Sequence, residues 1–201
     1  LIALPMVFSY GIITLIGVST MGKTEIREYI EAFLIAVLLA LFIIIFIAQS
    51  FMVQGSSMEP SLHNGQRLIV DKLSYRFGSP KLGDVIVFRY PTDPSRKFIK
   101  RVIGVPGDEI LIKGGYVYVN GERLVETYIN GPTYGAYASD YGPVIVPENS
   151  YFVLGDNRRK SDDSRFQDVG FVPRNLILGR AVVVYWPLNT IKIIRVPESL
   201  R

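Results

Sequence analysis

The N-terminal quarter of the chain holds two long apolar stretches around a short charged segment, whereas the rest alternates between short apolar runs and turn residues. Residues 32–48 hold no charge, glycine or proline. As a helix, the stretch 32–53 would span the roughly 30 Å of a bilayer's hydrocarbon core. It carries no polar stripe at helical spacing, and nothing else in the chain is long enough to surround it as a buried core helix. The pattern predicts a transmembrane anchor helix over residues 32–53.

A second uncharged stretch covers residues 1–22, although proline and glycine residues interrupt it. It is either a first transmembrane span or an apolar leader ahead of the true start. The second interpretation is favoured, because Met21 opens a segment that would make a natural N-terminus. A cleaved signal peptide is less favoured, because no basic residues precede the apolar run.

The basic residues that flank the anchor predict its direction. Lys23 and Arg27 precede it, and no Lys or Arg follows until Arg67. By the positive-inside rule, residues 23–31 are expected in the cytoplasm and residues 54–201 on the extracytoplasmic side of the membrane.

The pattern after the anchor is typical of β-structure. Gly114-Gly115 and Asn120-Gly121 separate strand-like runs and predict tight hairpins, while residues 130–147 favour a long loop. No helical pattern separates the strands, so we expect a mainly β domain of antiparallel sheets, in a sandwich or an open barrel. The predicted strands lie within 67–73, 84–90, 98–105, 109–124, 150–155 and 179–186.

Composition limits the chemistry that this domain can perform. Among 201 residues there is no Cys and one His, which excludes thiol nucleophiles, disulfides, Cys-ligated zinc, iron–sulfur clusters and two-His zinc sites. A Ser-His-Asp triad could use only His63, which also fits a plain turn after Ser57. The net charge of +4 is too mild to indicate nucleic-acid binding.

Three segments could carry catalysis. Gly55 to Leu62 (GSSMEPSL) reads as a shaped turn, or as a Ser-rich linker beside the membrane. Strand alternation places Lys100 on a face with Phe98 and Val102, where it either extends its amine to solvent or is buried and deprotonates readily enough to act as a base. Residues 155–165 (GDNRRKSDDSR) pack more polar groups than a turn needs, and fail the EF-hand calcium pattern.

Taken together, these segments resemble the motifs of bacterial type I signal peptidases, the Ser/Lys kind. The resemblance runs from about residue 28 to residue 187 and rests on several motifs in the family's order. They are GSSMEPSL (55–62), GDVIVF (83–88), FIKRVIGVPGD (98–108), GDNRRKSDDSR (155–165) and GRAVVVYWP (179–187).

The resemblance implies a role for each matching residue. Ser57 would be the nucleophile, its backbone N–H an oxyanion donor, and Lys100 the general base. Ser161 would orient the base, and Asp163 and Arg165 would form a supporting ion pair. Many relatives carry Ser or Thr where Gly55 stands, so a side-chain oxyanion donor is in doubt at that position.

The resemblance also implies substrates and surroundings. Exported preproteins would be cut after an Ala-X-Ala pattern, at the cell membrane, near the export machinery, without cofactor, metal or nucleic acid. The substrate would lie as an extended strand against a sheet edge. The residues that match the family's substrate pocket, with packing as their alternative role, are Phe51, Val53, Met58, Leu62, Phe98 and Ile99.

Two other functions compete with this one. A membrane-tethered β-sheet binding module without catalysis would leave Ser57 and Lys100 far apart. Alternatively, the same Ser/Lys chemistry could serve self-cleavage or pilin-like substrates.

Overall fold

A computed structural model describes residues 23–42, 48–136 and 139–200, so the predicted leader or first span at 1–22 lies outside it. The chain divides into two units, residues 1–41 and 42–201. The first contains all but the last residue of α1 (Lys23–Phe42), a helix whose large apolar side chains are exposed from Ile26 onward. None of the helices described is both long and apolar enough to cross a membrane.

The predicted helix over 32–53 is wrong at its C-terminal end. Residues 43–47 lie outside the description, and Ala48–Met52 form strand β1, which pairs with β2 (Arg67–Asp71) from Ala48↔Asp71 to Met52↔Arg67. Gln49 and Ser50 interrupt the apolar run there, and a strand can bond their backbone to a neighbour. The β unit therefore includes residues ahead of the predicted boundary at 54.

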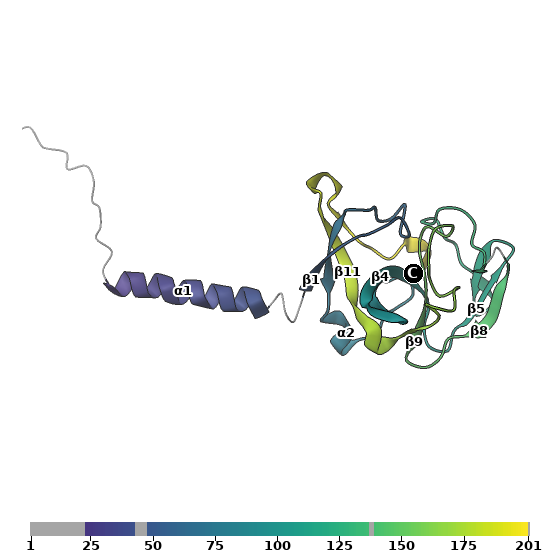
Figure 1. Cartoon of the computed structure of the whole chain (residues 1–201), viewed down its shortest axis with the longest axis horizontal. Coiled ribbons are helices and arrows are strands. Elements are labelled where there is room, and N and C mark those ends of the chain that lie inside the picture. The colour runs from purple at the N-terminus through teal and green to yellow at the C-terminus, as the bar shows by residue number, and fades with distance from the viewer. Residues whose placement is uncertain (1–22, 43–47, 137–138, 201) are drawn as a thin grey trace, which may run out of the picture. The chain divides into compact units, whose positions relative to one another are not determined.

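The β unit contains two antiparallel sheets (Figure 1), which confirms the mainly β prediction. The larger, eight-stranded sheet has the order β1-β2-β11-β3-β4-β9-β10, with β12 added to β11, and the smaller has the order β7-β6-β5-β8. The remaining strands are β3 (Val85–Tyr90), β4 (Asp93–Gly104), β5 (Glu109–Lys113), β6 (Tyr116–Val119), β7 (Glu122–Arg123), β8 (Tyr141–Ile145), β9 (Ser150–Leu154), β10 (Val172–Pro173), β11 (Ile177–Trp186) and β12 (Lys192–Ile193). The short helices are α2 (Ser74–Phe77), η3 (Arg174–Leu176), η4 (Leu188–Thr190) and η5 (Glu198–Leu200).

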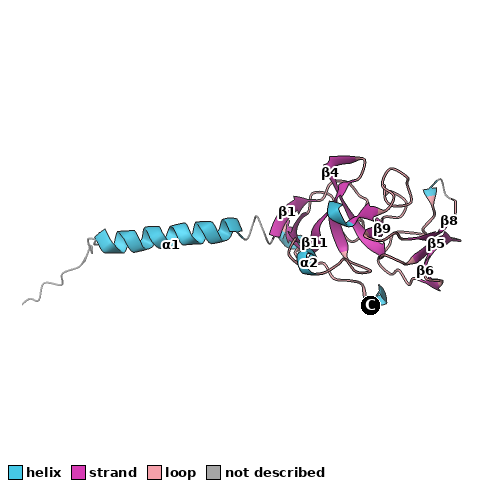
Figure 2. Cartoon of the chain, turned by 90° about the horizontal axis from the view of Figure 1, so that it is seen from below, coloured by secondary structure: helices cyan, strands magenta, loops and turns pink. Residues whose placement is uncertain are grey.

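Within this unit the small sheet lies at the end remote from β1 (Figures 1 and 2). It packs on the large sheet through a fully buried apolar cluster. Ile110, Ile112 and Val117 of the small sheet meet Ile103 of β4 and Phe152 of β9 there. The catalytic segments predicted from sequence belong to the large sheet and the loops that leave it.

The hairpins predicted at Gly114-Gly115 and Asn120-Gly121 are confirmed, since β5 pairs with β6 and β6 with β7 across them. The long loop expected over 130–147 is only partly a loop. Its last third forms β8, which pairs with β5. Gly142 and Pro143 hide that strand in the sequence, because both residue types are rare in strand interiors.

Candidate active site

Ser57 lies in a tight turn that follows β1. The Glu59 N–H donates to the Ser56 carbonyl at 3.1 Å, and the Leu62 N–H donates to the Met58 carbonyl at 2.8 Å. Ahead of them Gly55 has φ +85°, a backbone region that side chains rarely adopt. The Gly55 N–H donates to Asn64 Oδ1 at 2.9 Å. A family-type Ser or Thr at position 55 would be strained in this turn.

Lys100 extends from the middle of β4 directly to this turn. Its Nζ donates to Ser57 Oγ at 2.8 Å and to the Ile99 carbonyl at 3.2 Å. The residue is only 4% exposed, so the alternative of an amine that extends to solvent is wrong. The Phe98 ring, whose centroid is 5.1 Å from Nζ, covers the amine from the strand position two residues earlier.

The surroundings of Lys100 favour its neutral form. Burial lowers the pKa of Lys100 from 10.5 to about 8, although the carboxylates of Asp163, Asp162 and Asp156 oppose this shift. About a tenth of the amine is then neutral at pH 7. A neutral amine accepts a proton, so its hydrogen bond with Ser57 can carry the hydroxyl proton to nitrogen.

The loop after β9 holds the Ser57 turn in place. The Asn157 N–H donates to the Ser57 carbonyl at 3.0 Å, and Asn157 Nδ2 donates to the Ser56 carbonyl, also at 3.0 Å. Gly155 lies so close that a Cβ there would overlap both the Ser57 carbonyl oxygen and Ser161 Oγ. This contact explains why a glycine precedes the polar run.

Buried arginine–carboxylate pairs stabilise the same loop. Arg165 donates to both oxygens of Asp163, at 2.7 and 2.8 Å, and Asp163 in turn accepts the Gly155 N–H at 3.0 Å. This is the ion pair that the resemblance implied. Arg101 holds Asp156 in the same bidentate way, at 2.9 and 2.6 Å.

Sequence reasoning missed the partners of two loop residues. The sequence did not indicate Arg101 as the partner of Asp156, or Glu126 as the partner of Arg158. The Arg158 guanidinium donates to both Glu126 oxygens, at 2.8 and 2.5 Å. The crowding of Arg and Asp in 155–165 signalled that partners were needed. It did not reveal which distant residues supply them.

Ser161 does not make the hydrogen bond expected with Lys100. Its Oγ is buried and has no hydrogen-bond partner among the described residues, whereas the amine donates to Ser57 and to its own strand. Ser161 Oγ instead lies against Gly155. Ser161 therefore contacts Gly155, at the start of its own loop, and does not contact the Lys100 amine through a hydrogen bond.

Ser57 and Lys100 open onto a cleft of about 790 Å³. Five of the six predicted pocket residues line it, namely Phe51, Val53, Met58, Phe98 and Ile99. Leu62 lies 1% exposed in the apolar core beneath the turn, so its packing role is the one observed. His63 is paired with Glu59 at 3.8 Å and is exposed, while the hydroxyl of Ser57 bonds to Lys100.

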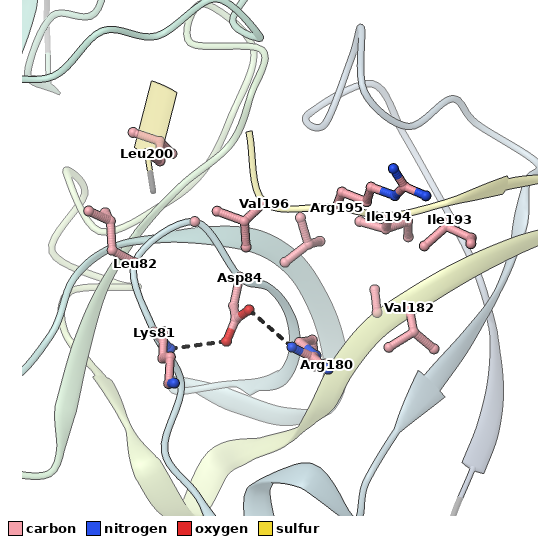
Figure 3. A pocket seen from close by; sticks show the side chains of 13 residues that line it. Lys81, Leu82, Asp84, Arg180, Val182, Ile193, Ile194, Arg195, Val196 and Leu200 are labelled. Carbon is pink, nitrogen blue, oxygen red and sulfur yellow. Dashed lines mark hydrogen bonds and ion pairs between the residues drawn. The ribbon is translucent and has the colours of Figure 1, made fainter. Parts of the chain in front are cut away.

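A second, smaller hollow of about 580 Å³ lies where the C-terminal segment crosses the sheet (Figure 3). Asp84 on its floor accepts the Lys81 N–H at 3.0 Å and pairs with Arg180 at 3.6 Å. Arg195 also lines it. No group of three or more His, Asp or Glu arranged to hold a metal ion occurs in the described ranges.

The cleft combines a hydroxyl group, a buried amine at 2.8 Å from it and walls that are apolar in part. A hydroxyl within hydrogen-bond reach of a potential base is a feature of sites for covalent hydrolysis. It is also the reverse of what a non-catalytic binding module predicts, since that alternative separates the two side chains.

Comparison with known proteins identifies the family of the chain. The chain is 46% identical to the probable signal peptidase I-2 of Synechocystis sp., over 84% of this chain and 73% of that protein. It is 44% identical to the signal peptidase I of Leptolyngbya laminosa, over 89% and 88% of the two chains, and 38% identical to that of Bacillus licheniformis, over 87% and 96%. Residues 26–186 match the family described as signal peptidase, peptidase S26, and the chain belongs to this family of serine-type peptidases.

Proposed function

We propose that this chain is a membrane-bound serine endopeptidase that removes N-terminal signal peptides from exported preproteins, with Ser57 as nucleophile and Lys100 as general base. The observation that carries the proposal is the 2.8 Å contact between Lys100 Nζ and Ser57 Oγ. Both atoms face a cleft whose apolar part, which includes Phe51, Val53 and Ile99, suits the small, uncharged residues of an Ala-X-Ala site.

The mechanism follows from that contact. Neutral Lys100 accepts the Ser57 hydroxyl proton as Oγ attacks the scissile carbonyl. The protonated amine then gives this proton to the leaving amino group, which leaves an ester between Ser57 and the signal peptide. Lys100 next takes a proton from a water molecule as that water attacks the ester carbonyl. The protonated amine then returns the proton to Ser57 Oγ as the ester bond breaks, which releases the signal peptide and regenerates Ser57 and neutral Lys100.

The oxyanion of each tetrahedral intermediate needs donors. The Ser57 backbone N–H supplies one, because Asn157 Nδ2 fixes the peptide between Ser56 and Ser57 through the Ser56 carbonyl. The glycine at position 55 supplies no side chain, so backbone donors contribute more here than in relatives with a hydroxyl residue.

The membrane part of the proposal rests on the sequence. The apolar run that begins at residue 32 and ends before β1 anchors the chain, and Lys23 and Arg27 hold its N-terminal side in the cytoplasm. The β unit then acts on the extracytoplasmic side, where preproteins emerge. Because the chain lacks Cys, a single cysteine introduced at Lys113 tests this, and its protection from a membrane-impermeant thiol reagent in intact cells would contradict it.

The test of catalysis uses the full chain in detergent with a preprotein that carries an Ala-X-Ala site. Ser57→Ala and Lys100→Met should each lower kcat/KM at least about 1,000-fold, since the two groups act as a unit. Lys113→Met, which removes an exposed cation from β5, is the matched control. Retained cleavage in either dyad variant would refute the mechanism, and substrate profiling separates preproteins from pilin-like or self substrates.

A further inference from the structure

The cations of the active-site loop fall into two groups. Arg158 and Arg165 are buried, at 3% and 7% exposure, and each is paired with a carboxylate. Arg159 and Lys160 are exposed, and neither belongs to an ion pair within the described ranges. The loop therefore keeps two charges that do not contribute to its own folding through such pairs.

Both unpaired cations line the cleft that contains Ser57 and Lys100. The next residue, Ser161, lies against Gly155, which itself lies against the Ser57 carbonyl. One or two residues of backbone, about 4 to 7 Å, separate Ser161 from these side chains. Arg159 and Lys160 therefore lie close enough to Ser57 to reach substrate residues a few positions away from the bond that would be cut.

The lining of the cleft indicates which part of a substrate meets them. Its apolar residues come from the end of β1 and from β4, and they include Phe51, Val53 and Ile99. The residues before the cut are small and uncharged, so they match these walls. Arg96 and Lys97 also line the cleft from β4, beside these walls, and Arg96 stacks on the Phe98 ring. The loop at 159–162 remains for the residues that follow the cut, which begin the mature chain.

We propose that Arg159 and Lys160 make this enzyme prefer preproteins with an acidic side chain among the first five residues of the mature chain. The inference rests on the proposed function and adds a substrate class to it. Asp162 is the one carboxylate among the lining residues, so this loop contributes a net positive charge to the cleft.

The experiment compares matched substrates in neutral detergent. A single preprotein carries Asp or its uncharged isostere Asn at each of the first five mature positions in turn, and kcat/KM is measured for every pair. We expect Asp to be favoured about five-fold at one or more positions, the size expected for one or two exposed charge pairs. Raising the salt from about 0.05 to 0.5 M should reduce this preference.

Variants assign the preference to the two side chains. In Arg159→Gln/Lys160→Gln the Asp-to-Asn ratio should fall toward one, with Arg96 and Lys97 still lining the cleft. In Arg159→Gln/Lys160→Glu the ratio should fall further. Lys113→Gln/Arg195→Gln removes two exposed cations outside the cleft and should keep the native ratio. If the double variant unfolds, Lys160→Gln alone should still lower the ratio about two-fold.

Several results would overturn the inference. They are a native ratio near one at all five positions, a ratio that the Gln variants leave unchanged, and a preference confined to residues before the cut. A preference that appears only when anionic phospholipid is added would assign these cations to a lipid headgroup instead. Absence of cleavage for every preprotein would refute the proposed function itself. The Asp-to-Asn ratio of kcat/KM tests only the substrate preference, so the two failures are distinguishable.

Discussion

Lys100 and Arg101 are consecutive residues of β4, and both are buried, at 4% and 2% exposure. Arg101 donates to both oxygens of Asp156 and to the Gly83 carbonyl. Lys100 forms no ion pair in the described part of the chain and donates to the Ser57 hydroxyl and one carbonyl. Strand alternation places the two cations on opposite faces of the sheet. The face of Arg101 supplies a paired carboxylate, whereas the face of Lys100 supplies neutral acceptors.

The difference follows from the chemistry of the two groups. A guanidinium stays protonated at any ordinary pH, so its burial requires a counter-charge and a full set of acceptors. An amine can lose its proton instead, and burial without a paired carboxylate favours that outcome. Arg101 thus stabilises the fold, whereas the burial of Lys100 lowers stability at neutral pH and favours the neutral amine that the proposed mechanism needs.

The largest expected effect comes from breaking the arginine pair. Asp156→Asn leaves the Arg101 guanidinium buried without its counter-charge, which should lower the free energy of unfolding by about 3–5 kcal/mol. Urea denaturation of the full chain in detergent measures this. Asp162→Asn, which neutralises an exposed carboxylate of the same loop, is the control and should change stability by less than about 0.5 kcal/mol. A loss below about 1 kcal/mol for Asp156→Asn would show that the buried pair is dispensable.

The opposite sign is expected for the lysine. Its pKa of about 8 in the folded chain lies below the ordinary 10.5, so the folded state releases this proton first as pH rises. At pH 7 the shift opposes folding by up to about 3 kcal/mol, and stability should rise with pH between about 8 and 10.5.

Lys100→Met should therefore raise the free energy of unfolding at pH 7 by up to about 3 kcal/mol while it abolishes cleavage. It should also remove the increase in stability between about pH 8 and 10.5. Denaturant midpoints measured at several pH values report both effects. Lys97→Met, which changes an exposed lysine of the same strand, should leave the stability and its pH dependence as in the native chain. A Lys100→Met chain less stable than the native one would mean that the amine is not penalised by burial.

The contrast between neighbours also shows what the sequence could predict. Period-two alternation in FIKRVIGV separated Lys100 from Arg101 and placed Lys100 among apolar residues. Strands and hairpins with strong local signals were predicted close to their observed bounds, because β-branched runs and Gly turns act locally. The dyad itself was identified from motif order, since nothing local brings Ser57 to a strand 43 residues away.

What escaped prediction depends on contacts between distant segments. The pairing of β1 with β2 decides that residues 48–52 are a strand, although their composition continues an apolar helix. Glu126 and Arg101 look like ordinary surface charges until the loop at 155–165 folds over them. Ser161 differs from its implied role because Gly155 and the Ser57 turn occupy its surroundings.

The smallest predicted effect is also the most direct test of the role of Lys100. If neutral Lys100 is the base, kcat/KM should fall about ten-fold for each pH unit below 8 and level off above it, because only the unprotonated amine can accept the Ser57 proton. Asp162 helps to keep the amine charged, so Asp162→Asn should move the midpoint to lower pH, whereas Lys113→Gln should not move it. The shift distinguishes Lys100 from any other group that titrates near pH 8, since a base elsewhere would not respond to this carboxylate. A profile that stays flat from pH 7 to 10 would mean that the amine 2.8 Å from Ser57 does not limit the reaction.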